Sequence, residues 1–290
     1  MEIAVISGKG GTGKSFISAA LATLKEKVLL ADCDVDAANL YLIFEPTHED
    51  EAIYIAGESA VIDHKKCSRC GLCISYCRFD ALSFDKEHKV DVNETNCDGC
   101  RLCAKICPEK AIVMIQNDKS RMYSGTFRNG KMVYGRLAPG EENSGKLVNM
   151  VRDKAKKVAK ENNLDTIIID GPPGIGCAVI SSITGVDHAV IVTEPTISGM
   201  HDLKRTFEVT DKFNLKTWVI INKYDLNEKI SKEVEQYCRG KNIQVLANIA
   251  FDPGVVQAMV NKKSITEYAP NSVISQQIEN AFQKINTHGK

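Results

Sequence analysis

Residues 2–24 read EIAVISGKGGTGKSFISAALATL, and this segment decides the fold. It begins with an apolar run from Glu2 to Ser7, which predicts a short buried strand. Gly8 to Ser15 follow with the pattern G-x4-G-K-[ST], and the residues up to about Leu24 favour a helix. A glycine-rich turn of this pattern between a strand and a helix predicts a P-loop. The segment therefore predicts an α/β fold that binds a phosphate group.

The P-loop residues have the chemistry that a nucleotide phosphate requires. Glycines let the backbone fold tightly so that its N–H groups face phosphate oxygens, and the helix N-terminus adds partial positive charge. We expect Lys14 to reach the β- and γ-phosphates and the Ser15 hydroxyl to bind Mg²⁺. The expected nucleotide contacts in this segment are Gly8, Lys9, Gly10, Gly11, Thr12, Gly13, Lys14, Ser15 and Phe16.

Carboxylates follow two other predicted strands. Asp32 and Asp34 come after the apolar run from Val28 to Ala31, and Asp170 comes after Thr166 to Ile169. Ligands of open parallel sheets bind at the carboxyl ends of the strands, so these side chains are expected near the P-loop. An apolar strand that ends in Asp is a Walker B arrangement, in which the carboxylate holds the magnesium water shell.

Lys9 adds a second cation to the P-loop. The run from Lys9 to Ser15 matches K-G-G-x-G-K-[ST], so the chain resembles the deviant-Walker ATPases, the class of MinD, ParA, Mrp and the nitrogenase iron protein. The resemblance implies that Lys9 reaches across a homodimer interface to the partner's nucleotide, with ATP held between the protomers. A second cation also fits charge neutralisation in phosphoryl transfer.

The same resemblance assigns roles to the carboxylates. The segment from Asp32 to Asn39 resembles the D-x-D-x4-N element of the class, which places Asp32 near the magnesium shell and gives Asp34 the attacking water. The run Asp-Gly-Pro-Pro-Gly-Ile-Gly from Asp170 resembles the Mrp branch. The expected catalytic residues are Lys9, Lys14, Asp34 and Asp170, and the expected magnesium residues are Ser15, Asp32, Asp34 and Asp170.

A later segment bears on the base. Asn222, Lys223, Tyr224 and Asp225 follow the predicted strand from Thr217 to Ile221, and Asn222 resembles the adenine contact of the class. The same residues fit the N-K-x-D guanine motif, so GTP is an alternative, although the deviant P-loop favours ATP. Lys223 and Pro253 complete the expected nucleotide contacts.

The cysteines form an internal repeat. Cys67, Cys70, Cys73 and Cys77 recur as Cys97, Cys100, Cys103 and Cys107, each run with the spacing C-x2-C-x2-C-x3-C. This spacing is typical of ferredoxins with two [4Fe–4S] clusters, in which the last cysteine of each run binds the other cluster. Zinc would leave a third cysteine of each run unused, and disulfides require an oxidising compartment. The predicted ligand sets are Cys67, Cys70, Cys73 and Cys107 for one cluster, and Cys77, Cys97, Cys100 and Cys103 for the other.

Three cysteines stand outside the repeat. Cys177 has the same offset from Asp170 as a cluster ligand of the nitrogenase iron protein, to which this part of the chain is similar. A ligand role between subunits is one interpretation, and a small buried thiol is the interpretation that the sequence favours. Cys33 and Cys238 are expected to be packing residues.

We therefore expect a doubly wound, mainly parallel α/β P-loop ATPase with an inserted α+β domain that resembles a bacterial ferredoxin. The expected boundaries are 1–61 and 117–290 for the ATPase domain and 62–116 for the insertion. An apolar stripe at Ile274, Ile278, Phe282 and Ile285 predicts a helix that packs on the core.

The composition bounds the partners. Lys plus Arg equals Asp plus Glu at 37 each, which gives no charge excess for nucleic acid or an anionic membrane. We found neither a signal-peptide layout nor a membrane-length apolar run, so we expect a cytoplasmic protein.

Three functions compete. One is ATP-coupled electron transfer through two clusters, in service of metal-cluster maturation; another is an Mrp-type ATPase that assembles or carries clusters. The third is a MinD- or ParA-like positioning ATPase with structural or sensory clusters. Ligands in a closed ferredoxin pattern suit clusters that are kept, so the sequence favours electron transfer. The expected partners are a second copy of the chain in the ATP state and a redox or metal-cluster client protein.

Overall fold

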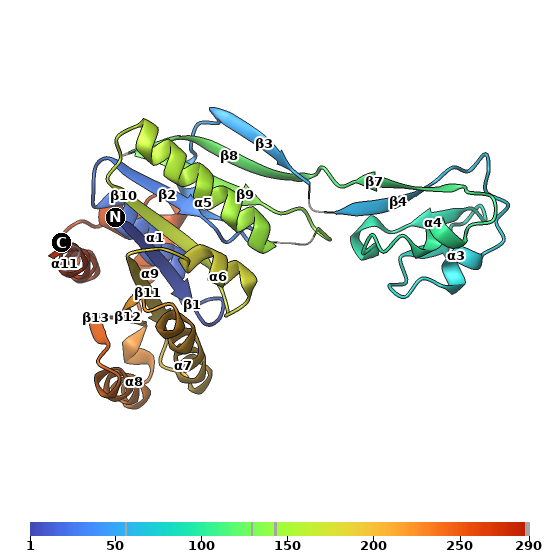
Figure 1. Cartoon of the computed structure of the whole chain (residues 1–290). Coiled ribbons are helices and arrows are strands. Elements are labelled where there is room, and N and C mark those ends of the chain that lie inside the picture. Colours follow the sequence, from blue (N-terminus) through green and yellow to red (C-terminus); the bar gives the residue numbers. More distant parts are fainter. Residues whose placement is uncertain (56, 129, 142–143, 288–290) are drawn as a thin grey trace. The chain divides into compact units, whose positions relative to one another are not determined.

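The computed structural model of the chain describes residues 1–55, 57–128, 130–141 and 144–287 (Figure 1). The chain divides into two compact units. The first unit comprises Met1–Glu51, Met122–Gly135 and Ser144–Lys290. The second unit comprises Ala52–Arg121 and Arg136–Asn143, and contains the whole cysteine repeat.

A 9-stranded sheet organises the first unit within the described residues. Its strands, in spatial order, are β13 (Gln244–Ile249), β12 (Lys216–Asn222), β11 (His188–Thr193), β1 (Glu2–Ser7), β10 (Thr166–Pro173), β2 (Val28–Asp32), β9 (Gly130–Arg136), β8 (Ser120–Phe127) and β3 (Asp50–Tyr54). Every neighbouring pair from β13 to β9 is parallel. The predicted mainly parallel α/β sheet is therefore confirmed.

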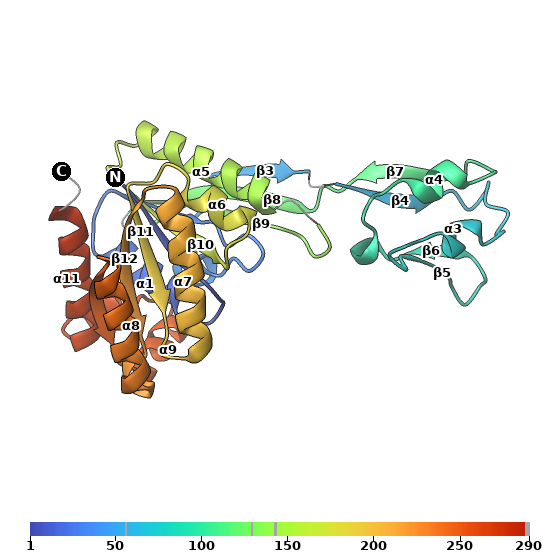
Figure 2. The same cartoon turned by 60° about the horizontal axis from the view of Figure 1, so that its bottom comes forward.

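Helices cover both faces of this sheet (Figure 1, Figure 2). Ile3 and Val5 pack in one core with α1 (Lys14–Thr23) and α11 (Val273–Thr287). Ala4 and Ile6 are equally buried, and they point to the opposite face because side chains alternate along a strand. That face contacts three other helices: α5 (Ser144–Glu161), α6 (Cys177–Ile183) and α7 (Ile197–Lys212).

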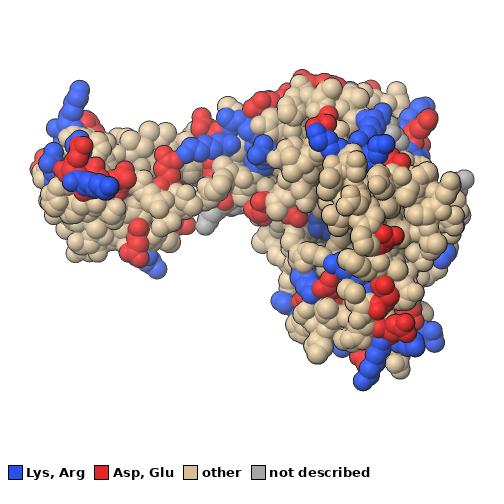
Figure 3. All heavy atoms as spheres, turned by 180° about the vertical axis from the view of Figure 1, so that it is seen from behind, with Lys and Arg blue, Asp and Glu red and all other residues tan. Residues whose placement is uncertain are grey.

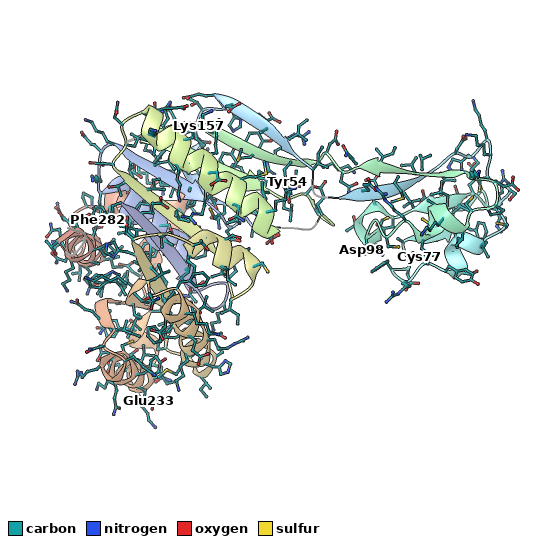
Figure 4. All side chains as sticks on the ribbon, in the orientation of Figure 1. Tyr54, Cys77, Asp98, Lys157, Glu233 and Phe282 are labelled. Carbon is teal, nitrogen blue, oxygen red and sulfur yellow. The ribbon has the colours of Figure 1, made fainter. Side chains whose placement is uncertain are left out.

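Four further α-helices complete the described part of the first unit, and α10 packs against α1. They are α2 (Leu40–Phe44), α8 (Glu228–Gly240), α9 (Pro253–Val260) and α10 (Ile265–Tyr268). The predicted apolar stripe of the C-terminal helix is buried in the core, as expected, and Phe282 in this helix is labelled in Figure 4. One boundary prediction is wrong: β10 does not end at Asp170 but continues to Pro173, because Ser7 pairs with Pro173 on the neighbouring strand.

The second unit is small and irregular. Strands β4 (Glu58–Ile62) and β7 (Ile112–Gln116) form one antiparallel pair, and β5 (Leu82–Phe84) and β6 (Val90–Val92) form another. Short helices α3 (Leu72–Ser75) and α4 (Leu102–Ile106) lie within the two cysteine runs and carry Cys73 and Cys103. β4 begins before residue 62 and pairs with β7, and the compact unit extends beyond the range 62–116. The domain boundaries and the assignment as a ferredoxin-like domain stay predictions.

The surface and the helices bear on the expected partners. On the face shown in Figure 3, acidic and basic side chains are interspersed over the molecule. No helix among the described residues is both long and apolar enough to span a membrane.

Candidate functional site

The P-loop is a tight turn between β1 and α1. Gly11 and Gly13 have φ angles of 82° and 93°, a left-handed conformation that glycine adopts without steric cost. A Cβ atom at Gly13 would lie 2.2 Å from the amide nitrogen of Asn222, the last residue of β12. The Asn222 side chain therefore packs directly against the loop. Asn222 Nδ2 donates to the Thr12 carbonyl at 2.8 Å, and Lys223 Nζ donates to the Gly11 carbonyl at 3.2 Å. The loop is therefore held in shape by the chain itself.

Lys14 lies at the centre of a buried polar cluster. Its Nζ is 3.0 Å from Asp170 Oδ1 and 3.3 Å from Asp34 Oδ2. Ser15 donates its hydroxyl to Asp170 Oδ2 at 2.7 Å. Burial opposes the charge of the ammonium, but Asp170 and Asp34 outweigh this effect and raise the pKa of Lys14. The structure thus brings together the residues expected at the β- and γ-phosphates and at magnesium.

Asp32 is fully buried and faces backbone rather than the cavity. Its carboxylate accepts hydrogen bonds from the N–H groups of Asp34, Asn39 and Leu40 at 3.2 to 3.3 Å. Burial, together with the charge of Asp170, raises the pKa of Asp32 to about 8. Burial also raises the pKa of Asp34, although Lys14 acts against it. Asp32 therefore shapes the loop that carries Asp34.

Lys9 points away from this cluster. Its Nζ lies 2.7 Å from Glu194 Oε1 and donates to Ser198 Oγ at 2.9 Å. Thr196 Oγ1 is a further acceptor at 3.3 Å and also caps α7 by accepting from Gly199 N–H. The side chain of Lys9 remains 29% exposed. The loop between β11 and α7 therefore holds Lys9 at the surface.

A cavity of about 730 Å³ opens beside the P-loop. Asp34, Asn39 and Cys177 line it on the side of the carboxylates, and Phe251, Val256 and Met259 line an apolar end. Asn222 and Lys223 also line the cavity. The polar end suits phosphates and the apolar end suits a purine base.

The base end is closed by a loop after β13. Asp225 Oδ1 accepts a hydrogen bond from the Phe251 N–H at 2.7 Å, and Asp252 caps α9 by accepting from Gly254 N–H. Phe251 and Asp252 line the cavity, whereas Pro253 begins α9 and does not line it. Asp225 thus positions the loop that carries the apolar wall.

The cysteines line two separate cavities in the second unit. One cavity is lined by Cys67, Cys70, Cys73 and Cys107, and the other by Cys77, Cys97, Cys100 and Cys103. These are the two sets that the spacing predicts, each completed by the last cysteine of the other run. Cys77 and Asp98, which are labelled in Figure 4, both line the second cavity. Their role as iron ligands stays a prediction.

The backbone repeats its conformation around the two cavities. Residues at matching positions have positive φ angles, namely Arg69 and Gly99, Gly71 and Arg101, and Asp80 and Lys110. The N–H of Ala81 donates to Cys77 Sγ and that of Ala111 to Cys107 Sγ, each at 3.3 Å. Across the described part of the chain, no three His, Cys, Asp or Glu side chains converge as ligands of a single metal ion. Ligands of a cube bind different irons, so they need not converge on one point.

The comparisons with known proteins decide the family. A model of the CobQ/CobB/MinD/ParA nucleotide binding domain matches residues 3–265. The chain belongs to this family. An uncharacterised protein of Methanocaldococcus jannaschii is 35% identical over 288 residues, which are 98% of this chain and 96% of that protein. The septum site-determining protein MinD of Thermotoga maritima is 24% identical, over 99% of this chain and 88% of its own.

A solved structure agrees with the fold of the family. MinD of Pyrococcus horikoshii OT3, complexed with Mg-ADP, has a TM-score of 0.60 and 20% identity, and the match covers 99% of this chain and 96% of that one. The member described here is a P-loop ATPase. These relatives favour the MinD- and ParA-like alternative over ATP-coupled electron transfer, which the comparisons do not support.

Two features of this family member differ from the sequence analysis. Cys177 is not a buried thiol: it is exposed and lines the cavity, because it is the first residue of α6 and follows an open glycine loop. Cys33 and Cys238 are buried, as expected. The sequence analysis did not identify Ser18, whose hydroxyl donates to Asp170, or Glu194, which pairs with Lys9. The helical spacing from Ser15 could have indicated Ser18, but Glu194 belongs to no recognisable motif.

Proposed function

We propose that the chain is an ATP-dependent dimerising switch of the MinD/ParA type, and that its second unit carries two [4Fe–4S] clusters as a structural or sensory module. The position of Lys9 carries the proposal. Its ammonium is held 2.7 Å from Glu194 and does not line the cavity of its own chain. This position does not suit contact between Lys9 and the phosphates bound by its own chain, so the nucleotide of a partner protomer is the better target.

The remaining residues divide the work of hydrolysis. Lys14 binds the β- and γ-phosphates of ATP, while Ser15 and Asp170 hold Mg²⁺ and its water shell. Asp34 lines the cavity and orients the attacking water, and Asp32 holds the backbone of the Asp34 loop. Hydrolysis yields ADP and phosphate, and Lys14 keeps its contact with the β-phosphate until ADP dissociates.

The second unit has residues that fit two clusters. Each cavity has thiols from both cysteine runs, apolar walls and a backbone N–H that donates to sulfur. Cys67, Cys70, Cys73 and Cys107 would hold one cluster, and Cys77, Cys97, Cys100 and Cys103 the other. A bound [4Fe–4S] cluster supplies a one-electron redox couple. Because each set takes thiols from both cysteine runs, a bound cluster would cross-link the two runs and so have a structural role.

ATP rather than GTP is the proposed nucleotide. Asp225 would have to read a guanine, but its Oδ1 is occupied by the Phe251 N–H. Asn222 and Lys223 are bonded to the P-loop backbone, an arrangement that supports the loop for either purine. Competition between ATP and GTP for binding tests this point, with tighter binding of GTP as the contrary result.

Dimerisation in ATP tests the switch. Asp34→Ala should slow hydrolysis and so keep ATP bound. The mass of this variant in solution should be that of a dimer with ATP and that of a monomer with ADP. Adding Lys9→Ala should abolish the ATP-dependent dimer. Lys25→Ala is the matched control, because Lys25 is similarly exposed and pairs with Asp165 as Lys9 pairs with Glu194. An ATP dimer that survives Lys9→Ala would contradict the proposal.

Electron transfer coupled to ATP is the second candidate. It is favoured by the two cysteine-lined cavities of one unit, since two neighbouring clusters form a path for an electron. The test is the midpoint potential of each cluster without nucleotide, with ADP and with ATP. A shift of about 60 mV, or about 1.4 kcal/mol, would link redox state to nucleotide state. Equal midpoint potentials in the three nucleotide states would exclude this coupling. In a separate assay, transfer of iron from the chain to an apo-protein would favour an Mrp-type carrier.

A further inference from the structure

Ser18 occupies an unusual place for a serine in α1. It is fully buried, and its Oγ lies 2.7 Å from Asp170 Oδ1 and 3.1 Å from the Lys14 carbonyl. A hydroxyl has one proton to donate. Hydrogen bonds to a carboxylate are stronger and shorter than those to a neutral carbonyl, so the proton goes to Asp170. Ser18 is therefore a partner of the Walker B carboxylate.

The other two side chains bonded to Asp170, Lys14 and Ser15, are also expected to bind the ligand. Oδ1 is also bound by Lys14, and Oδ2 accepts from Ser15. Lys14 is the expected phosphate ligand and Ser15 the expected magnesium ligand, so both exchange partners when Mg-ATP binds. Ser18 does not, because it is fully buried one helical turn behind Lys14. Among the described side chains bonded to Asp170, Ser18 is the one that no ligand can reach.

We propose that Ser18 is a positioning residue for magnesium. Its hydroxyl holds Oδ1 of Asp170, so that the other carboxylate oxygen stays directed at Ser15, the expected magnesium ligand. The proposal concerns the ATPase site alone and does not depend on clusters or dimerisation. If Ser18 only filled space in α1, replacing it with alanine should leave metal binding unchanged. Alanine is the better helix former, and a serine in a helix interior gains little from a hydrogen bond to its own backbone.

Ser18→Ala separates these roles. The variant removes one atom and keeps the helix, so the expected effect is on metal rather than on folding. With ATP present, the affinity for Mn²⁺, measured by electron paramagnetic resonance, should fall about tenfold, as for other groups that orient a metal ligand. Binding of ATP in the presence of EDTA should be unchanged. The Mg²⁺ concentration that half-saturates hydrolysis should rise by the same factor.

Two further variants make the outcome decisive. Ser18→Thr keeps the hydroxyl and should restore the Mn²⁺ affinity, whereas Ser18→Cys keeps the shape with a weaker donor and should not. Thr210→Val is the matched control, since Thr210 is fully buried and donates within its own helix to Phe207 O. Wild-type Mn²⁺ affinity in both Ser18→Ala and Ser18→Cys would overturn the proposal. An equal loss of ATP binding in EDTA would also overturn it, because it would indicate general damage.

Discussion

The two units meet the needs of their binding residues in different ways. In the first unit, the groups of the phosphate site bond to one another: Lys14 to Asp170 and Asp34, and Ser15 to Asp170. In the second unit, the sulfurs line cavities, and backbone N–H groups donate to sulfurs of both, such as Ala81 to Cys77 and Ala111 to Cys107. The side chains of the phosphate site therefore position one another through direct hydrogen bonds and ion pairs.

This difference has a consequence for stability. The first unit has a large core in which the sheet packs against α1 and α11. The buried apolar cluster of the second unit is small, and partly buried cysteines pack around it; its members are Ala60, Ile62, Leu82, Val90 and Ile112. Small cores rarely suffice for a stable fold without a metal or disulfides. The second unit should therefore depend on its ligand, and the first should not.

Removal of iron is expected to have the largest effect. Chelation under reducing conditions should unfold the second unit, because its thiols then lose the cross-links between the two cysteine runs. Hydrogen exchange should show loss of protection in β4 and β7 and full protection in β1 and β10. ATP binding by the first unit serves as the internal control. An iron-free second unit with native protection would remove the proposed contrast.

Lys14→Ala tests the first unit. Loss of a cation that neutralises the phosphates should lower the rate of hydrolysis about 10²- to 10³-fold. The change also leaves Asp170 buried with one partner fewer, so a lower melting temperature of the first unit is expected. Iron content and cluster absorbance should be unchanged. Loss of iron in this variant would show that the two units are not independent.

Cys70→Ser and Cys100→Ser test the assignment of ligands. Each should remove about half of the iron, because each cysteine lines one cavity only. Cys177→Ala is the matched control, since Cys177 is also exposed but belongs to the first unit. Unchanged iron in either serine variant would contradict the ligand sets. Loss of iron in Cys177→Ala would revive its interpretation as a ligand between subunits.

The sequence predicted local motifs better than contacts between side chains that are far apart in the chain. Short-range patterns predicted three features: the P-loop, the parallel sheet and the apolar stripe of the C-terminal helix. The patterns are the spacing of apolar residues and the positions of glycines in a tight turn. Ser18 and Glu194 were not predicted, because their importance depends on contacts with Asp170 and Lys9 that lie far away in the sequence. Cys177 was misjudged because exposure is a property of the folded loop and not of the residue.

The smallest expected effects compare the two cysteine runs directly. Arg69 corresponds to Gly99, and Arg101 corresponds to Gly71, and both arginines have φ angles near 60°. A left-handed conformation costs a residue other than glycine about 1–2 kcal/mol, so Arg69→Gly should raise the melting temperature of the second unit.

Arg101→Gly should gain the same relief but lose the ion pair with Glu58, whose oxygens accept from Arg101 Nε and Nη2 at 2.7 and 2.6 Å. An exposed pair of this kind contributes about 0–1 kcal/mol, so the net change should be smaller than in Arg69→Gly. Thermal melting of the iron-loaded protein, followed by cluster absorbance, measures both. If Arg101→Gly stabilised the second unit as much as Arg69→Gly, the Glu58 pair would contribute nothing, and the two runs would be equivalent in energy as well as in backbone conformation.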